Sequence, residues 1–219
     1  MRAHPADCPA VRAIRRPLVL AAAAAAGIGI SLWWRKNPSA CPYNQRFWVQ
    51  LPHPFITRAR LAEILEPKAR ERLLEIGPGT GYYTLDIAAR LDGGRLELFD
   101  IQQEMLDHVA RLAGERGLEG IVPWHGDAQD MLFEDNRFDG AFLVTVLGEI
   151  PDQDAALREL ARVVKPGGRV VFGEIGFDPH MVTFDGLRER AAAAGLEYER
   201  RLGTGFAYFA RFRVPAAAR

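Results

Sequence analysis

A glycine-rich segment, Glu75-Ile76-Gly77-Pro78-Gly79-Thr80-Gly81, has residue types and a spacing suited to ligand binding. Its three glycines let the backbone turn tightly and approach a ligand closely, while the helix expected next points its N-terminal amides at the ligand. Dinucleotide-binding loops follow the spacing Gly-x-Gly-x-x-Gly, but Tyr82 follows the third glycine here, which falls one place early. The carboxylate of Glu75 suits an ammonium group better than a pyrophosphate. The segment therefore weighs against nicotinamide and flavin cofactors.

Two acidic residues follow the next two predicted strands. Asp100 lies 19 residues after Gly81, where a carboxylate can accept hydrogen bonds from two ribose hydroxyls. The alternative role for Asp100 is to cap the following helix. Asp127, within Gly126-Asp127-Ala128, could meet an exocyclic amine while its small neighbour leaves room for a ring, although this tripeptide alone would be a plain turn. Together with the glycine segment, the two acids indicate a nucleoside ligand.

The elements that must position these residues alternate along the chain. Strands are predicted at 72–76, 95–99, 120–124, 138–144 and 168–174. Helices are predicted at 82–91, 103–116, 153–164 and 184–194, the third of them ending in a turn at 165–168. This alternation predicts a parallel sheet with helices on both faces.

The chain ends in two strand-like runs, 197–202 and 207–214, which are separated by Gly203-Thr204-Gly205. A final hairpin places one strand antiparallel to the others, which a purely parallel dinucleotide-binding sheet does not require. The fold class expected is therefore α/β, with a Rossmann-like seven-stranded sheet that ends in an antiparallel hairpin.

An apolar stretch near the N-terminus, residues 17–34, contains no charged residue. Basic residues flank it on both sides: Arg12, Arg15, Arg16, Arg35 and Lys36. A membrane-spanning helix needs roughly 17 to 25 apolar residues, and the paired tryptophans at 33 and 34 suit the headgroup region. Because many of the residues are alanine, which adds little to insertion, a helix lying in the interface stays an alternative. A membrane anchor is the hypothesis favoured here.

A signal peptide or a wrongly assigned start codon could also account for this apolar stretch. A cleaved signal peptide would place its cleavage site directly after the apolar run, but four residues, 35–38, intervene before Ser39-Ala40-Cys41, a partial match to a lipoprotein site. A wrongly assigned start codon would make the stretch meaningless. The retained anchor is preferred, and the alternatives stay open.

Between the anchor and the first strand, the sequence turns to prolines, polar residues and large aromatics. A short helix is predicted at 57–65, with Thr57 as its N-cap and Pro67 beyond its end. This helix either packs onto the core or serves as a lid between bilayer and site. Three parts are expected: a tail and anchor at 1–36, a linker and cap at 37–67, and a ligand-binding domain at 68–219.

The composition narrows the classes of partner. Lys+Arg and Asp+Glu number 28 each, and no basic run interleaved with aromatics occurs in the body of the chain, so a nucleic-acid partner is not indicated. The two cysteines, Cys8 and Cys41, lack the spacing of metal ligands, so neither a metal site nor a disulfide framework is expected.

Five motifs occur in order and at ordinary spacing over roughly residues 70 to 175. They are Leu73 to Thr84, Asp100-Ile101 with Met105-Leu106, Gly126-Asp127-Ala128, Phe138-Asp139 to Pro151-Asp152, and Leu160 to Gly168. As a set they resemble the class I S-adenosylmethionine-dependent methyltransferases of the ubiquinone/menaquinone-biosynthesis type. The resemblance implies an enzyme that uses S-adenosyl-L-methionine.

The resemblance also implies a role for each cofactor-binding residue. Glu75, Gly77, Pro78, Gly79 and Gly81 would surround the amino-acid part of the cofactor, Asp100 would bind the ribose, Ile101 would pack on the adenine, Asp127 and Ala128 would complete the adenine site, and Thr145 would line the cofactor from the segment after the fourth strand. In that segment, relatives often carry histidine at the positions of Gly148 or Glu149. Its absence puts a histidine-assisted step there in doubt.

Methyl transfer from a sulfonium is an in-line displacement, so alignment of the reacting groups matters most and a general base is optional. If the acceptor carries a proton, the polar candidates are His180, Glu149, Glu174 and His53. The hypothesis for His180 is that it faces the substrate, and the alternative is a solvated loop histidine.

An anchor beside an aromatic cap suggests an acceptor that partitions into the bilayer: a phospholipid head group, a quinone precursor, or a lipophilic thiol or phenol. The need for cytosolic cofactor places the catalytic domain on the cytoplasmic side of the membrane. Two alternatives are a non-catalytic S-adenosylmethionine-binding module at a membrane and a nucleotide-dependent oxidoreductase. The acceptor atom and the oligomeric state cannot be predicted from the sequence.

Overall fold

The computed structural model of the chain describes residues 39–43 and 54–216. The apolar stretch at 17–34 and His53 lie outside these residues. Among the helices of the described ranges, none combines the length and apolar character that crossing a bilayer requires. The membrane-anchor hypothesis therefore stays a prediction from the sequence.

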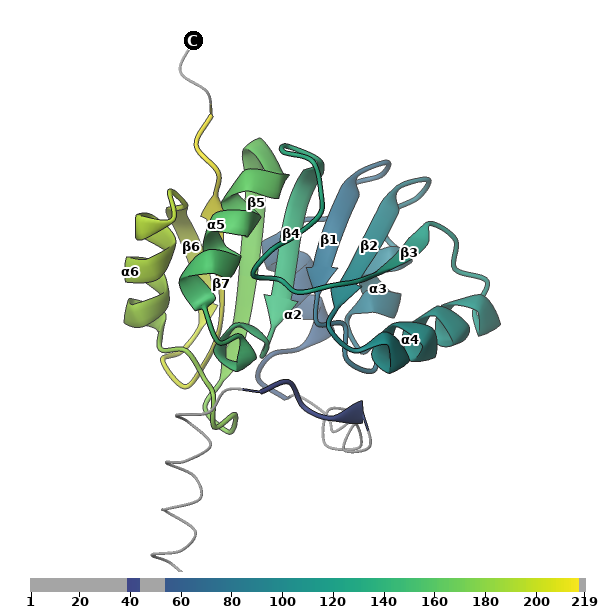
Figure 1. Ribbon diagram of the computed structural model, residues 1–219, viewed down its shortest axis with the longest axis horizontal. Helices are drawn as coiled ribbons and strands as arrows, with labels where there is room; N and C mark the ends of the chain where they lie inside the picture. Colours follow the sequence, from purple (N-terminus) through teal and green to yellow (C-terminus); the bar gives the residue numbers. More distant parts are fainter. Residues whose placement is uncertain (1–38, 44–53, 217–219) are drawn as a thin grey trace, which may run out of the picture. The chain divides into compact units, whose positions relative to one another are not determined.

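Seven strands form one mixed sheet in the order β3-β2-β1-β4-β5-β7-β6 (Figure 1). Their bounds are β1 Arg72–Ile76, β2 Arg95–Asp100, β3 Ile121–His125, β4 Phe138–Val144, β5 Val164–Ile175, β6 Glu197–Gly203 and β7 Ala207–Arg213. The first five strands pair in parallel, while β7 pairs antiparallel with both β5 and β6. The predicted α/β sheet with its C-terminal antiparallel hairpin is confirmed.

The described helices are α2 Arg58–Leu65, α3 Thr84–Ala88, α4 Gln103–Glu115, the 3-10 turn η3 Leu147–Glu149, α5 Gln153–Val163 and α6 Phe184–Ala193. The helix predicted at 82–91 is wrong in length, because α3 has only five residues. The turn of the glycine segment continues to Tyr83, and tighter bonds at the other end, Arg90 N to Ile87 O and Leu91 N to Ala88 O, close the helix early.

The turn predicted at 165–168 is also wrong, because β5 begins at Val164. Pairing with β4 steps from Val164 opposite Phe138 to Arg169 opposite Gly140, so a bulge in β5 absorbs the extra residues. Gly167, with φ 79°, donates its N–H to Val214 O at 2.8 Å, and this bond with the far side of the hairpin keeps the segment in the sheet.

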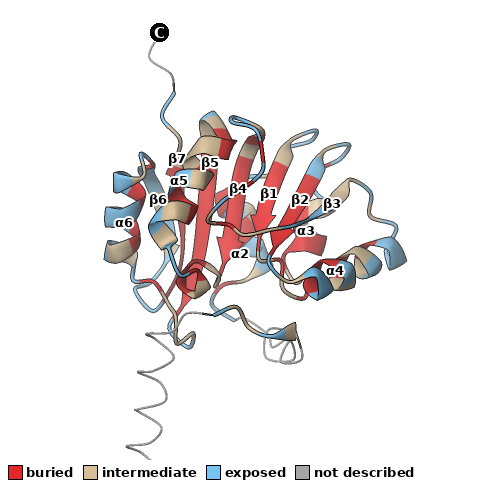
Figure 2. Ribbon diagram, viewed as in Figure 1, coloured by how far each residue is buried: buried red, intermediate tan, exposed pale blue. Residues whose placement is uncertain are grey.

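The inner strands of the sheet, β2, β1, β4, β5 and β7, are mostly buried, whereas the edge strands β3 and β6 are largely exposed or half-buried (Figure 2). α2 and α3 pack on one face, with Leu61, Ile64 and Ile87 in the same apolar cluster as Phe209 of β7. α5 and α6 pack on the other face, where Leu157 belongs to the cluster that contains Phe172. Helices on both faces leave the carboxyl ends of the parallel strands as the edge where loops gather.

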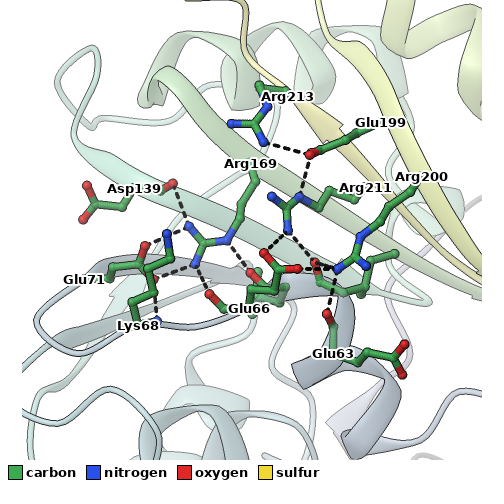
Figure 3. A network of polar contacts seen from close by, with 12 residues as sticks. Glu63, Glu66, Lys68, Glu71, Asp139, Arg169, Glu199, Arg200, Arg211 and Arg213 are labelled. Carbon is green, nitrogen blue, oxygen red and sulfur yellow. Dashed lines mark hydrogen bonds and ion pairs between the residues drawn. The ribbon is translucent and has the colours of Figure 1, made fainter.

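Helix α2 forms as the sequence predicts and takes the packing role. Thr57 is its N-cap and accepts from Arg60 N at 3.3 Å. At its other end Glu66 adopts φ 50°, and two arginines of the sheet bind the last carbonyl groups (Figure 3). Arg169 donates to Leu65 O and Glu66 O, and Arg211 donates to Ile64 O at 3.0 Å. The two guanidinium groups thereby satisfy carbonyls that a helix end leaves without partners.

Carboxylates complete this arginine network. Arg169 binds both oxygens of Glu71, at 2.9 and 2.6 Å, and only 8% of its side chain is exposed. Arg211 is equally buried and contacts Glu66 at 2.9 Å and Glu199 at 2.7 Å. Paired and hydrogen-bonded charges of this kind fix a single geometry, so the network holds α2 in register with β5 and β7.

Replacing Arg169 by lysine is expected to lower the free energy of unfolding by about 2 kcal/mol, because the ammonium keeps the charge but cannot make the forked set of hydrogen bonds. Urea denaturation followed by circular dichroism measures the change. Arg111, whose exposed side chain pairs with Glu115 on α4, supplies the matched control. Arg111→Lys should change the value by less than about 0.5 kcal/mol. Equal effects of the two substitutions would contradict the role of the arginine network in holding α2 on the sheet.

Candidate active site

The glycine segment forms a turn at the carboxyl end of β1, as predicted. Gly77, Gly79 and Gly81 all have positive φ angles, 65°, 52° and 80°. Gly77 N donates to Phe99 O at 2.9 Å, which ties the turn to the end of β2, and Gly81 N donates to Pro78 O at 2.9 Å. A Cβ atom on Gly77 would lie 2.5 Å from a methyl group of Val146. Glycine is therefore required both by the backbone angle and by the close approach.

Glu75 lies one residue before the end of β1, and only 3% of it is exposed. Its Oε2 atom has no hydrogen-bond partner within the described residues. Burial raises the pKa of Glu75 to about 8, against an opposing effect of the Thr84 side chain and with a smaller contribution from the nearby Asp100. A buried carboxylate oxygen without a partner is costly, and an ammonium group placed beside it would remove that cost.

Asp100 ends β2 and is 9% exposed. Its Oδ1 accepts from Gln102 N at 2.8 Å, so it forms a local turn, while Gln102 itself is the N-cap of α4. Burial raises the pKa of Asp100 to about 6. The next side chain, Ile101, is 55% exposed. An acid beside an exposed apolar side chain offers a polar and an apolar contact of the kind that a nucleoside needs.

The segment after β3 joins the same edge. Gly126 N donates to Asp100 O at 3.0 Å, and a Cβ on Gly126 would lie 2.5 Å from the Phe99 ring. Asp127 accepts from the Gln129 side chain with both oxygens, at 2.9 and 2.8 Å, and Ala128 is buried. The structure thus brings Asp127 and Ala128 to the edge beside Asp100, and their contact with adenine stays a prediction.

Thr145 directly follows β4, with the unusual φ of 56°. Its N–H donates to Gly173 O at 2.8 Å, and its hydroxyl donates to Val144 O at 2.7 Å. The hydroxyl is thus used within the loop, and the backbone of Thr145 turns Val146 toward Gly77. Its role as a cofactor-binding residue stays a prediction.

Four titratable residues gather where β4 and β5 end. Glu149 Oε2 accepts from Cys41 N at 3.3 Å, and Glu174 Oε2 accepts from Val182 N at 3.2 Å. Asp178 accepts from the backbone N–H of His180 at 2.8 Å, and the His180 Nδ1 atom lies 4.0 Å from the same carboxylate. Burial raises the pKa of Glu149 to about 8 and places the pKa of Glu174 well above its usual value. The negative charge of the nearby Asp178 adds to both shifts.

The loop that carries His180 lies directly on η3. A Cβ on Gly148 would collide with the His180 carbonyl oxygen, so a histidine cannot occupy position 148 in this structure. The His180 side chain also packs beside Gly148, because a Cβ on Gly148 would lie 3.0 Å from the His180 Cβ. The structure therefore brings together the two catalytic candidates of the sequence, His180 and Glu149, through the elements that follow β5 and β4.

One connection was not predicted from the sequence. The side chain of Gln102 holds the start of the linker in two places: its Nε2 donates to Cys41 O at 3.0 Å, and its Oε1 accepts from Tyr43 N at 3.1 Å. Because Gln102 N also binds Asp100, the upstream segment is linked to the predicted ribose acid. A glutamine at a helix start carries no sequence signal for such a link.

Stability should fall as pH rises, because the folded state retains protons that the unfolded carboxyl groups have lost. For Glu149 the window runs from about pH 4.5, its ordinary pKa, to about 8, its pKa in the fold. Glu149→Gln keeps an acceptor for Cys41 N and should reduce the loss of unfolding free energy between pH 5 and 8 by more than about 1 kcal/mol. Denaturant titrations at the two pH values measure this difference.

Glu115→Gln, at an exposed position on α4, is the matched control and should leave the pH dependence of wild type. A Glu149→Gln protein whose stability falls with pH as steeply as wild type would contradict the buried, protonated state of Glu149. The pH dependence of the unfolding free energy that remains in that variant is attributed to Glu75, Asp100, Glu174 and Asp178. Burial raises the pKa of each of these groups as well.

Comparisons with known proteins show what this domain is similar to. Residues 74–172 match the family model described as a methyltransferase domain. Over 150 residues the chain is 34% identical to a demethylmenaquinone methyltransferase of Clavibacter sepedonicus. The matched region makes up 68% of this chain and 56% of that relative. The chain thus spans little more than half the length of that curated protein.

Solved structures share the fold. A S-adenosylmethionine-dependent methyltransferase from Aquifex aeolicus superposes with a TM-score of 0.73 over 80% of this chain and all of its own, at 16% identity. The [4+2]-cyclase SpnF superposes with a TM-score of 0.66 over 73% of this chain and 80% of its own, at 22% identity. At these identities the similarity concerns the fold alone, and it extends to an enzyme named for different chemistry.

Proposed function

We propose that this chain, which carries an S-adenosylmethionine-dependent methyltransferase domain, transfers a methyl group to a lipophilic or membrane-associated small molecule. The observation that carries the proposal is the buried Oε2 atom of Glu75 at the glycine turn, for which residues 39–43 and 54–216 offer no hydrogen-bond partner. The cofactor of this family bears an ammonium group that such an atom would bind. Asp100, at the end of the neighbouring strand β2, would accept the ribose hydroxyls.

The residues at the strand ends fit this cofactor. Glu75 would bind its ammonium group, and the turn at 77–81, with Pro78 in it, would carry the rest of its amino-acid part. Asp100 would bind the ribose, and the exposed Ile101 would pack on the adenine. Asp127 and Ala128 would complete the adenine contact, and Thr145 would approach from β4.

When bound, S-adenosylmethionine supplies a methyl group on a positively charged sulfur. The chain has to align the acceptor with that methyl and exclude water. Where the acceptor carries a proton, His180 is our candidate to receive it, and Glu149, whose pKa of about 8 keeps it protonated at neutral pH, is suited to hold a hydrogen bond to the acceptor. Full turnover in a His180→Ala variant would remove His180 from this role.

Two observations support a lipophilic acceptor. The curated relative is named for demethylmenaquinone, an acceptor of the quinone class. The uncharged stretch at 17–34 has the length and flanking residues of a membrane anchor. Quinone precursors, phospholipid head groups and lipophilic thiols or phenols are therefore the acceptor classes proposed. The protein is proposed to lie at the membrane with its domain on the cytoplasmic side.

The experiment is transfer from S-adenosylmethionine labelled on its methyl group, with two acceptor mixtures prepared from the same cells. One is a total lipid extract, and the other is a water-soluble metabolite extract. The proposal predicts label in organic-soluble product only. Label confined to water-soluble product would contradict the acceptor class, and cofactor binding without transfer in either mixture would favour a non-catalytic binding module.

The anchor has a separate test in cell fractionation of the full-length chain and a chain lacking residues 1–36. The full-length protein should sediment with membranes, and removal of the segment should shift it toward the soluble fraction. A full-length protein found wholly in the soluble fraction would overturn the anchor without bearing on methyl transfer.

A further inference from the structure

Three exposed aromatic side chains form a cluster that the core does not explain. Phe55, Phe177 and Phe206 are 46%, 74% and 45% exposed. The ring centroids of Phe55 and Phe206 lie 6.1 Å apart, and those of Phe177 and Phe206 lie 5.0 Å apart, both in edge-to-face geometry. The three residues come from segments far apart in sequence. We call this cluster the aromatic rim.

The aromatic rim lies at the carboxyl edge of the sheet, beside the candidate active site. Phe206 precedes Ala207, which pairs with Ile175 at the end of β5. Gly176 N donates to Phe206 O at 2.7 Å, and Phe177 follows immediately, one residue before Asp178. The rim therefore borders the group of acids and His180 described above.

The third member reaches this edge from the segment that precedes α2. Phe55 precedes Ile56, whose carbonyl oxygen accepts from the Tyr83 hydroxyl at 2.5 Å, and Tyr83 follows the glycine turn. The rim thus extends between the acceptor side, near Asp178, and the cofactor side, near the glycine turn. An exposed apolar cluster at this place points to contact with an apolar phase or partner.

The backbone is adapted to keep these rings together. A Cβ on Gly176 would collide with the Phe206 ring, so only glycine lets that ring lie against the end of β5. These rings contact one another edge to face but leave about half or more of their surface exposed to water. They therefore gain less free energy from burial than aromatic rings in the core do. The arrangement leaves apolar surface on the outside of the protein.

Positive charge accompanies the apolar surface. Arg58 and Arg60, in the first turn of α2, are exposed. Arg60 donates to Phe55 O at 2.8 Å, and the Arg58 guanidinium lies 4.9 Å from the centre of the Tyr82 ring. Aromatic and basic side chains side by side suit the interface of a bilayer that contains anionic lipids.

The upstream chain enters the domain at the same edge. Cys41 N is bound to Glu149, and the uncharged stretch ends at Trp34, five residues before Ser39. The described residues that follow the uncharged stretch therefore contact the edge that carries the aromatic rim.

We propose that the aromatic rim inserts into the headgroup region of an anionic lipid bilayer and turns the acceptor side of the active site toward it. A lipophilic acceptor would then reach His180 and Glu149 from the bilayer without crossing water. This consequence rests on the proposed function, whereas lipid contact of the rim does not.

The test uses the full-length chain with Cys8 and Cys41 replaced by serine and a single fluorescent label on a cysteine at position 177. Vesicles contain four parts phosphatidylcholine to one part phosphatidylglycerol, with a nitroxide on the acyl chain near the headgroup. The matched control carries the label at position 132, because Leu132 is 93% exposed in the segment between β3 and β4. Nitroxide quenching of the two labels is compared.

The label at 177 should be quenched at least about twofold more than the label at 132, and vesicles of phosphatidylcholine alone should reduce the difference. Equal quenching at the two positions, or none at 177, would overturn the proposal. A label at 177 that is shielded from water before vesicles are added would also overturn it, because another copy or segment would then cover the rim. Methyl transfer is not needed for any of these outcomes.

Discussion

Replacing Gly77 by alanine is expected to lower the free energy of unfolding by about 3 kcal/mol and to abolish measurable cofactor binding. The added Cβ would lie 2.5 Å from a methyl group of Val146, a stiff side chain, and the φ of 65° would strain any L-residue. Overpacking costs about 1 to 3 kcal/mol and the backbone strain about 1 to 3 more. Relief of the contact by moving the turn would displace the amides that we propose approach the cofactor.

Gly117 provides the matched control for this substitution. Its φ of 64° is nearly that of Gly77, but a Cβ there would meet no atom of the described residues within 4 Å. Gly117→Ala should therefore cost only the backbone term, about 1 kcal/mol, and leave cofactor binding unchanged. In the double variant Gly77→Ala/Val146→Ala the contact is removed and part of the stability should return. A Gly77→Ala protein no less stable than Gly117→Ala would contradict the close packing of the turn.

The second large effect concerns Asp100. Asp100→Ala is expected to weaken binding of S-adenosylmethionine by about 100-fold, because charge-assisted hydrogen bonds to the ribose contribute about 1.5 to 3 kcal/mol each. Isothermal titration of the variant and wild type measures the ratio of dissociation constants.

Loss of the local turn could itself disturb the start of α4, so a control that loses the same kind of bond is needed. Asp152 accepts from Ala155 N at 2.9 Å as the N-cap of α5 and is exposed. Asp152→Ala should cost about 1 kcal/mol of stability and leave the dissociation constant within about twofold of wild type. An Asp100→Ala protein that binds the cofactor less than about fivefold more weakly than wild type would exclude ribose binding by Asp100.

Much of the fold could be predicted because local patterns and long-range pairing agree. The strands β1 and β4 match their predicted bounds, since each is an apolar run set off by polar or glycine residues. α3 was predicted too long because the helical spacing of 82–91 gave no sign that the glycine turn would continue to Tyr83. The start of β5 depends on pairing with Val214, about 50 residues away, which no local pattern contains.

The candidate site also contains residues that could be predicted from the sequence and contacts that could not. Glu75, Gly77 and Asp100 were predicted because strand ends and glycine spacing are local signals, and the parallel register of β1 and β2 brings them to one edge. The pairing of Gln102 with Cys41 and Tyr43, and the cluster of Phe55 with Phe206, join segments that only the tertiary fold brings together. Their residues carry no periodic or motif signal, so the structure was needed to find them.

The central claim, that the carboxyl edge binds a sulfonium amino-acid nucleoside, is tested most directly by isothermal titration of the full-length protein. S-adenosylmethionine, its demethylated product and NAD are titrated in turn at neutral pH. We predict saturable binding of S-adenosylmethionine and its product that is lost in Asp100→Ala and kept in Asp152→Ala, with no binding of NAD. Tight binding of NAD with none of S-adenosylmethionine would contradict the claim.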